Sequence, residues 1–139
     1  MLGFVLAAAT AALVAAAPAA AAGKPRDVVR AWSAALNAND NERAARLFAL
    51  NARVVQPGID VPLTSHKLAV AFNDSLPCAG KIVAIAVAGN RATATFVLAE
   101  RPKHKCDAPG VKAAALFVVR AGKIVRWQQV AVPDGKATA

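Results

Sequence analysis

The sequence predicts a single α+β domain, in which three N-terminal helices pack on a mostly antiparallel sheet. Apolar residues recur at helical spacing in the first part of this domain, and apolar runs separated by turn residues fill the second part. The segment 25–132 is long enough to enclose one hydrophobic core but not two. We therefore expect one domain at 25–132, followed by a flexible tail at 133–139.

Two helices are expected at the start of the domain. Pro25 lies near the first turn of the first helix, where its missing N–H costs nothing, and the helix should extend to about Ala38. Its apolar positions are Val28, Val29, Trp32, Ala35 and Leu36. Asp40 can cap a second helix. The expected apolar face of that helix is Ala44, Leu47 and Phe48.

The remaining elements are a short strand, a third helix and two hairpins. The β-branched pair Val54-Val55 predicts a strand that ends at Pro57-Gly58, and Thr64 or Ser65 can cap a helix that extends to about Asn73. Two antiparallel hairpins should follow. They span Lys81 to Glu100, with a turn at Gly89-Asn90, and Val111 to Val132, with a turn near Ala121-Gly122.

Residues 1–22 have the features of a secretory signal peptide. The segment has no charged side chain, and an alanine-rich apolar stretch leads to Ala20-Ala21-Ala22, an A-x-A cleavage signal. A membrane-spanning helix is the alternative, since it needs roughly 20 apolar residues. Because segments rich in small residues usually are removed, we expect cleavage after Ala22 and an exported protein, either periplasmic or secreted.

The chain carries an excess of positive charge. It has 17 Lys and Arg residues against 8 Asp and Glu residues, which gives a formal net charge of +9. The basic residues are scattered, apart from a group formed by Arg101, Lys103, His104 and Lys105. Such a group is more typical of a solvated loop than of a nucleic-acid interface. We expect no nucleic-acid partner and only a weak attraction to anionic envelope surfaces.

The two cysteines, Cys78 and Cys106, predict a structural disulfide. An even number of cysteines in an exported chain is the setting in which such a bond forms and persists. Neither cysteine has a second ligand nearby at zinc-site spacing, and only His66 and His104 are available as histidine ligands. We therefore expect no metal and no cofactor.

Several segments resemble a known superfamily. The run VVRAWSAALNAND, from Val28 to Asp40, is similar to the opening helix of ketosteroid isomerases and SnoaL-like polyketide cyclases. The similarity continues through Leu47-Phe48-Ala49, the run ARVVQPG that starts at Ala52, and the closing hairpin with Gly122-Lys123-Ile124-Val125. The chain thus resembles the nuclear-transport-factor-two-like (ketosteroid-isomerase-like) superfamily over roughly 25–132. The resemblance implies a cone-shaped half-barrel, whose helices and curved sheet enclose an apolar pocket.

The catalytic residues of ketosteroid isomerase have no equivalents here. In that enzyme an Asp base abstracts a proton, while a Tyr and a protonated Asp stabilise the oxyanion. The resemblance places Trp32 at the Tyr position, Gln56 at the base position and Ala115, within one residue, at the second Asp position. An amide cannot accept a proton near neutral pH, so general-base catalysis at that position is lost.

Other titratable residues are weak candidates for catalysis, and the catalytic residues remain unknown. His66 begins the third helix, where it serves as a pocket acid or base less often than as an exposed first-turn residue. Asp60 and Asp74 lie beside predicted turns, where capping or solvation is the more frequent role. Glu100 ends a strand, and a charge at the pocket rim is its more frequent role.

The expected ligand pocket combines an apolar wall with a few polar groups. The wall consists of Phe48, Val97, Phe117 and Trp127, and the polar groups are Gln56, Gln129 and the Trp32 N–H. Each aromatic residue can equally belong to an ordinary core. A register slip of one residue in the closing hairpin would replace Trp127 and Gln129 with Arg126 and Gln128.

Three hypotheses for function follow. The first is an exported protein that binds a small apolar or amphipathic molecule, with little or no catalysis. The second is a SnoaL-like isomerase, cyclase or hydrolase that uses an unrecognised pocket residue such as His66. The third is a partner-binding or scaffold module whose cavity is filled by its own side chains. In that third case the outer face of the sheet carries the function. Independently of these hypotheses, the closing strands, apolar on both faces over Ala113 to Val119, predict a homodimer through that outer face.

Overall fold

The structure is a computed structural model that describes residues 10–12 and 23–134. The predicted signal peptide, except for residues 10–12, and most of the predicted tail lie outside the described residues. Within the part of the chain that the structure describes, no helix is both long and apolar enough to cross a membrane.

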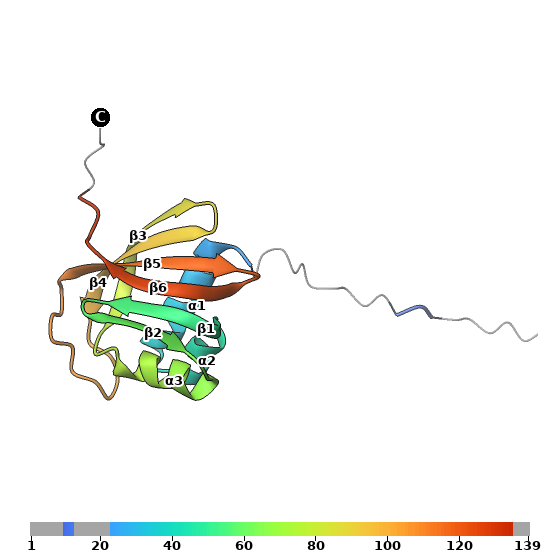
Figure 1. Ribbon diagram of the computed structural model, residues 1–139, viewed down its shortest axis with the longest axis horizontal. Helices are drawn as coiled ribbons and strands as arrows, with labels where there is room; N and C mark the ends of the chain where they lie inside the picture. Colours follow the sequence, from blue (N-terminus) through green and yellow to red (C-terminus); the bar gives the residue numbers. More distant parts are fainter. Residues whose placement is uncertain (1–9, 13–22, 135–139) are drawn as a thin grey trace, which may run out of the picture.

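Three helices pack against one face of a curved, unclosed sheet of six strands, as predicted for an α+β half-barrel (Figure 1). The helices are α1 (Pro25–Asn37), α2 (Asn41–Arg46) and α3 (His66–Ser75), and the strands are β1 (Phe48–Gln56), β2 (Ile59–Leu63), β3 (Ala79–Ala88), β4 (Arg91–Ala99), β5 (Lys112–Arg120) and β6 (Lys123–Val130). The strand order is β2-β1-β6-β5-β4-β3. Only the β1–β6 pair is parallel among these described strands.

The helix starts follow the predicted capping residues. The Asp40 side chain accepts a hydrogen bond from the backbone N–H of Arg43, and the Ser65 hydroxyl accepts one from Leu68. Helix α1 lies across β3, β4 and β5, and its buried apolar residues are those that the helical spacing indicated. Trp32 therefore points from the middle of α1 into the layer between helix and sheet.

The prediction for the end of the second helix was wrong. Helix α2 ends at Arg46, and Phe48 is the first residue of β1. The backbone N–H of Ile124 donates a hydrogen bond of 2.8 Å to the carbonyl of Leu47. Pairing with β6 thus replaces the last helical turn, because the parallel β1–β6 ladder begins at Phe48 and Ile124. Phe48 remains buried, but on the sheet.

The sheet contains one strand more than predicted. Pro57-Gly58 does not end an isolated strand but forms the turn between β1 and β2, in which Gln56 pairs with Ile59. Gly58 has a φ of +76°, a conformation that glycine adopts without steric cost. Pro62 lies within β2, and this strand is at the edge of the sheet, where the missing N–H is tolerated.

Both predicted hairpins are confirmed. Strands β3 and β4 are joined at Gly89-Asn90, and β5 and β6 are joined at Ala121-Gly122. Ala121 and Gly122 have φ values of +49° and +74°, as in the two-residue turns that match the twist of antiparallel strands. The closing hairpin therefore has the register Phe117 to Trp127 and Ala115 to Gln129.

An aromatic cluster fills the space between helices and sheet. The Trp32 ring lies 5.2 Å from Phe117 and 6.3 Å from Trp127, measured between ring centroids. Phe72 of α3 lies 5.1 Å from Trp127 and 5.8 Å from Phe48. Most of these pairs meet edge to face, a favourable geometry for aromatic rings. The cluster forms the packed end of the half-barrel.

Candidate functional site

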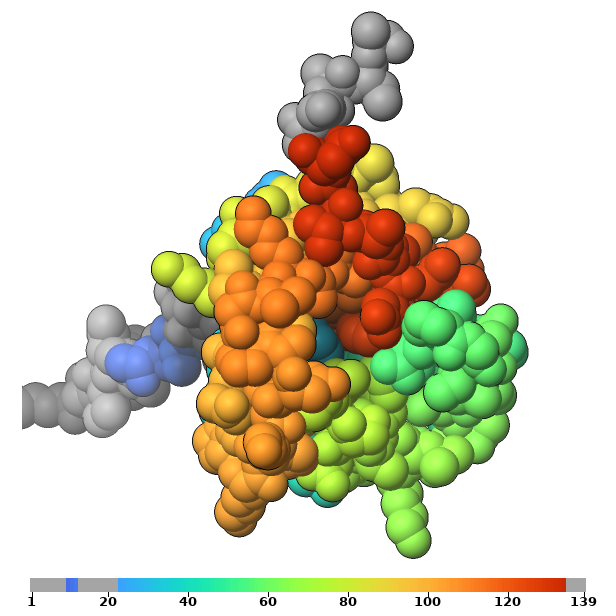
Figure 2. Space-filling view, turned by 90° about the vertical axis from the view of Figure 1, so that its left-hand side faces the viewer, coloured from blue at the N-terminus to red at the C-terminus, as the bar shows by residue number. Residues whose placement is uncertain are grey.

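A cavity of about 310 Å³ lies between α1 and the inner face of the sheet. Figure 2 shows it as a hollow bordered by the loop after β4, the end of β6 and the β1–β2 region, with α1 visible at its floor. This volume is at the lower end of the range for small-molecule sites in proteins. The geometry provides a partly open site for one small molecule.

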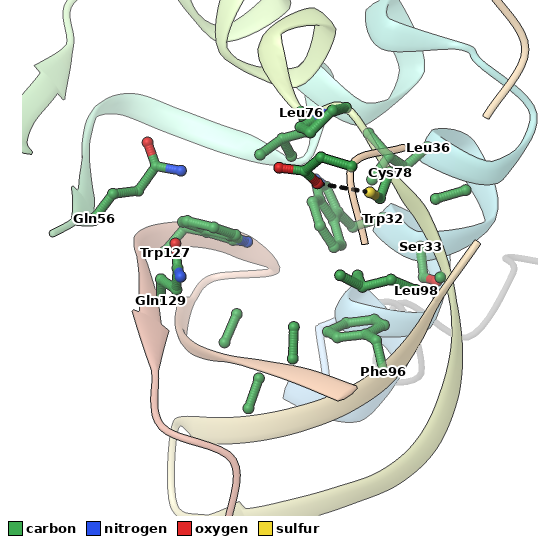
Figure 3. A pocket seen from close by; sticks show the side chains of 17 residues that line it. Trp32, Ser33, Leu36, Gln56, Leu76, Cys78, Phe96, Leu98, Trp127 and Gln129 are labelled. Atoms are coloured by element: carbon green, nitrogen blue, oxygen red, sulfur yellow. Dashed lines mark hydrogen bonds between the residues drawn. The ribbon is translucent and has the colours of Figure 1, made fainter. Parts of the chain in front are cut away.

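The cavity wall is mainly apolar, with two side-chain amides on one side. In Figure 3 the side chains of Gln56, Trp127 and Gln129 lie opposite those of Trp32 and Phe96. The complete lining is Trp32, Ser33, Leu36, Gln56, Leu76, Pro77, Cys78, Ala79, Gly80, Phe96, Leu98, Asp107, Ala113, Ala114, Ala115, Trp127 and Gln129. Apolar walls with few polar groups are usual for sites that bind small organic molecules.

Four of the seven predicted pocket residues line this cavity, namely Trp32, Gln56, Trp127 and Gln129. They come from α1, β1 and β6, and the parallel β1–β6 pairing brings the two strands together. In that pairing Val54 lies opposite Trp127. The alternative register, with Arg126 and Gln128 in the cavity, is not the one observed.

Val97 does not line the cavity, and that prediction is corrected. Val97 pairs with Lys81 of β3 and Lys112 of β5, so these three residues share the outer face of the sheet. Its neighbours Phe96 and Leu98 line the cavity instead. The reason is strand parity, since successive residues of a strand point to opposite faces.

Phe48 and Phe117 also do not line the cavity. Phe117 is completely buried, at 0% exposure, against Trp32. Phe48 packs on Phe72 at the closed end of the half-barrel. Both belong to the hydrophobic core, the alternative that the sequence left open for these aromatic residues.

The free indole donor is on Trp127 and not, as expected, on Trp32. The Trp32 Nε1–H donates a hydrogen bond of 2.8 Å to Asn73 Oδ1, so it has no proton left for a ligand. The Nε1–H of Trp127 is buried without a hydrogen-bond partner among the described residues. Unsatisfied buried donors are rare in proteins, and those that do occur often mark functional sites.

A disulfide-anchored loop forms one wall of the cavity. Cys78 and Cys106 are bonded, which confirms the predicted pairing, and Cys78 lines the cavity. In the chain-entropy model such a bond contributes about 3 kcal/mol to stability. The bond holds the segment between β4 and β5 against the start of β3. It thereby fixes the position of Asp107, the residue after Cys106, at the cavity.

Asp107 is a site residue that the sequence analysis missed. Among the described residues that line the cavity, it is the only one with a charged side chain. Its Oδ1 lies 3.6 Å from Cys78 Sγ, as the dashed line in Figure 3 shows. This is a van der Waals contact, because a disulfide sulfur carries no proton. The adjacent half-cystine was the one sequence signal that could have placed Asp107 near the helix layer.

Cys78, Cys106 and Asp107 come within 4.8 Å of one another, but they do not form a metal centre. Metal ions bind the thiolate form of cysteine. Both sulfurs are consumed by the disulfide, so one carboxylate is the only strong ligand left in the group.

Arg101 anchors the other end of this loop. The residue is 2% exposed, and its guanidinium donates to the carbonyls of Asn73 and Leu76 at 2.6 and 2.7 Å. It also donates to the side chains of Asn39 and Asn41. Burial lowers the pKa of Arg101, and the nearby Asp74 carboxylate partly offsets this effect. The loop is thus attached to the C-terminal end of α3, where unpaired carbonyls favour a cation.

His66 does not line the cavity, so it is not placed to act as a pocket acid or base, the less frequent of the two roles considered for it. Its Nε2 is 2.7 Å from Glu42 Oε2, and both side chains are more than half exposed. As the first residue of α3 it faces α2 and solvent. The other weak candidates are also occupied elsewhere, because Asp60 pairs with Arg53 and Glu100 accepts the Cys106 backbone N–H. Asp74 accepts from Asn41.

The three positions compared with ketosteroid isomerase do meet in the cavity. Trp32, Gln56 and Ala115 all line it, from α1, β1 and β5. At these three positions the cavity carries an indole, an amide and a methyl group, none of which is an acid or a base near neutral pH. The one carboxylate among the described residues of the lining, Asp107, comes from a different part of the fold.

The comparisons with known proteins agree with this architecture. The family model for the SnoaL-like domain matches residues 29–127. No curated protein matches the sequence.

Solved structures with the same fold share little sequence with this chain. A nuclear-transport-factor-two-like protein of unknown function from Cytophaga hutchinsonii has a TM-score of 0.63 at 14% identity, covering 77% of this chain and 88% of its own. A candidate polyketide cyclase from Sinorhizobium meliloti has a TM-score of 0.61 at 21% identity, covering 75% and 94%. A protein with a ketosteroid isomerase-like fold from Catenulispora acidiphila, in complex with trimethylamine, has a TM-score of 0.61 at 22% identity, covering 76% and 85%. These likenesses support the fold.

Proposed function

Since this chain belongs to the family of SnoaL-like domains, we propose that its cavity binds one small apolar or amphipathic molecule and releases it unchanged. The observation that carries this proposal is the cavity itself. It is open, largely apolar and about 310 Å³ in volume. The residues at the three isomerase positions, Trp32, Gln56 and Ala115, provide no acid or base. The structural neighbour from Catenulispora acidiphila, in complex with trimethylamine, is a case of this fold together with a small molecule.

Filling the cavity should weaken binding strongly while leaving the fold intact. Ala115 is 3% exposed and lines the cavity, so Ala115→Leu places extra volume inside it. We expect at least a ten-fold loss of affinity for the neutral fluorophore 1-aminoanthracene, measured by fluorescence titration. The matched control is Ala86→Leu on the exposed part of β3, which should bind as the wild type does. Equal binding by wild type and Ala115→Leu would contradict the proposal, provided that circular dichroism shows both to be folded.

A catalytic function is the second candidate, and the Asp107 carboxylate in the cavity is the observation that favours it. Isomerases and cyclases that abstract a proton beside a carbonyl need such a base. The test is the Asp107→Asn variant. If the wild type converts a natural substrate, and the variant still binds that substrate but no longer converts it, the protein is a catalyst and not only a binding protein.

Export is a further part of the proposal. The disulfide between Cys78 and Cys106 is compatible with an oxidising compartment outside the cytoplasm. We expect that the protein isolated from its own host begins at Gly23, because Ala20-Ala21-Ala22 forms the cleavage signal. N-terminal sequencing of that material measures this directly. Intact residues 1–22 together with two free thiols would contradict export.

We also propose a homodimer through the outer face of the sheet. Leu116 lies at the centre of this face, opposite Thr93 of β4 and Gln128 of β6, and is only half-buried in one chain. Sedimentation at micromolar concentration should give a dimer, and Leu116→Lys should give a monomer because a buried unpaired charge is costly. Ala31→Lys, on the exposed side of α1, is the control and should remain dimeric. A monomeric wild type would rule out this interface.

A further inference from the structure

The unpaired indole of Trp127 indicates what one end of the ligand must carry. The Trp127 side chain is 6% exposed, and its Nε1–H has no hydrogen-bond partner among the described residues. Figure 3 shows the nitrogen end of this ring turned toward the Trp32 side of the cavity. An indole N–H is a donor only, so the group that satisfies it must be an acceptor such as a carbonyl oxygen.

The two amides on the same wall favour the same kind of group. Gln56 of β1 and Gln129 of β6 line the cavity beside Trp127. Neither side chain forms a hydrogen bond with any other described residue of the chain. Both offer N–H donors that carry no formal charge, so this wall presents uncharged donors to the oxygen-bearing end of a ligand. Neutral donors suit a carbonyl, whereas a carboxylate placed there would have no cation to balance it.

At the disulfide-anchored loop, by contrast, the cavity favours a positively charged group on the ligand. Asp107 is the only charged side chain among the described residues of the lining, and it forms no ion pair with a basic residue in the part of the chain that the structure describes. The chain as a whole has a net charge of +9, so this single acidic group gives the cavity a charge opposite to that of the molecule. The aromatic rings of Trp32, Phe96 and Trp127, which line the same cavity, favour cations through their electron-rich faces.

We propose that the cavity selects a small organic cation, an amine on an apolar body, which also carries a carbonyl-type oxygen. The oxygen accepts from Trp127 and the ammonium group lies at Asp107. This inference rests on the proposed function, because it presupposes that the cavity binds a small molecule.

The test uses four probes that share one aromatic ring. These are 4-(aminomethyl)acetophenone with a ketone and an ammonium group, acetophenone with the ketone alone, 4-methylbenzylamine with the ammonium group alone, and 4-acetylbenzoate with a ketone and a carboxylate. The chain contains two tryptophans, so the protein with ¹⁵N-labelled indoles gives two indole signals, which Trp127→Phe assigns. We expect both the amino ketone and acetophenone to shift the Trp127 signal, while the Trp32 signal, held by Asn73, moves much less.

Affinities measured by the same titrations test the charge preference. The amino ketone should bind about five-fold or more tightly than acetophenone, and 4-acetylbenzoate should bind most weakly. Asp107→Asn should remove the advantage of the amino ketone without weakening acetophenone, and Asp27→Asn on exposed α1 should change neither affinity. Equal affinity of all four probes with an unmoved Trp127 signal would overturn this inference but leave the proposed function standing. Failure of every probe, and of 1-aminoanthracene, to bind would overturn both.

Discussion

Replacing Arg101 with Met should lower the free energy of unfolding by about 3 kcal/mol. The guanidinium is buried and serves four acceptors, two backbone carbonyls at the end of α3 and two asparagine side chains. Methionine has a similar length but donates to none of them, so the acceptors lose a charged partner and the buried ones remain unsatisfied. Chemical denaturation followed by circular dichroism measures the loss.

Arg91→Met is the matched control for this change. Arg91 is exposed on β4, where the same substitution should alter stability by less than about 0.5 kcal/mol. Arg101→Lys should not restore stability, because an ammonium group lacks the planar fork that reaches several acceptors at once. Equal stability of Arg101→Met and wild type would mean that the loop is held by the disulfide alone.

The wild-type protein should not isomerise 3-ketosteroids, and restoring the base alone should not make it an efficient isomerase. Gln56 cannot abstract a proton. In Gln56→Asp the base is present, but the oxyanion would still find only the alanine side chain at position 115 and an indole at position 32 whose N–H is already bonded to Asn73. Loss of one oxyanion donor typically costs about 100- to 1000-fold in turnover. Turnover of a 3-keto-5-ene steroid, followed by absorbance, provides the measurement.

The triple variant Gln56→Asp, Trp32→Tyr and Ala115→Asp is the comparison for that experiment. It should exceed the single variant in turnover, since all three positions face the same cavity. Its folding needs a separate check, because removing the Trp32 indole leaves the buried Asn73 Oδ1 without its donor, a cost of about 1 to 3 kcal/mol. Wild-type turnover well above the buffer rate would contradict the prediction. In that case Asp107 is the base to test, since His66 lies outside the cavity.

Local sequence patterns determined most of the fold. The apolar spacing around Trp32, the caps at Asp40 and Ser65 and the turn at Gly89-Asn90 each depend on a few neighbouring residues, and all are observed. The pairing of Cys78 with Cys106 also followed, because only one pairing of two cysteines within the chain is possible. The family could also be recognised from the sequence, because the resemblance to it lies in short contiguous runs of residues.

Tertiary structure decided which side chains form the site. A shift of one position along β4 separates Val97 on the outer face from Phe96 and Leu98 in the cavity, and only the pairing of neighbouring strands fixes that parity. The availability of an indole N–H depends on Asn73, which lies 41 residues from Trp32. Asp107 reaches the cavity through the disulfide that bonds its neighbour Cys106 to Cys78, the residue just before β3. The sequence by itself thus determined the scaffold, because local spacing encodes it, whereas the free donor and the single charge of the cavity arise from contacts between residues far apart in the chain.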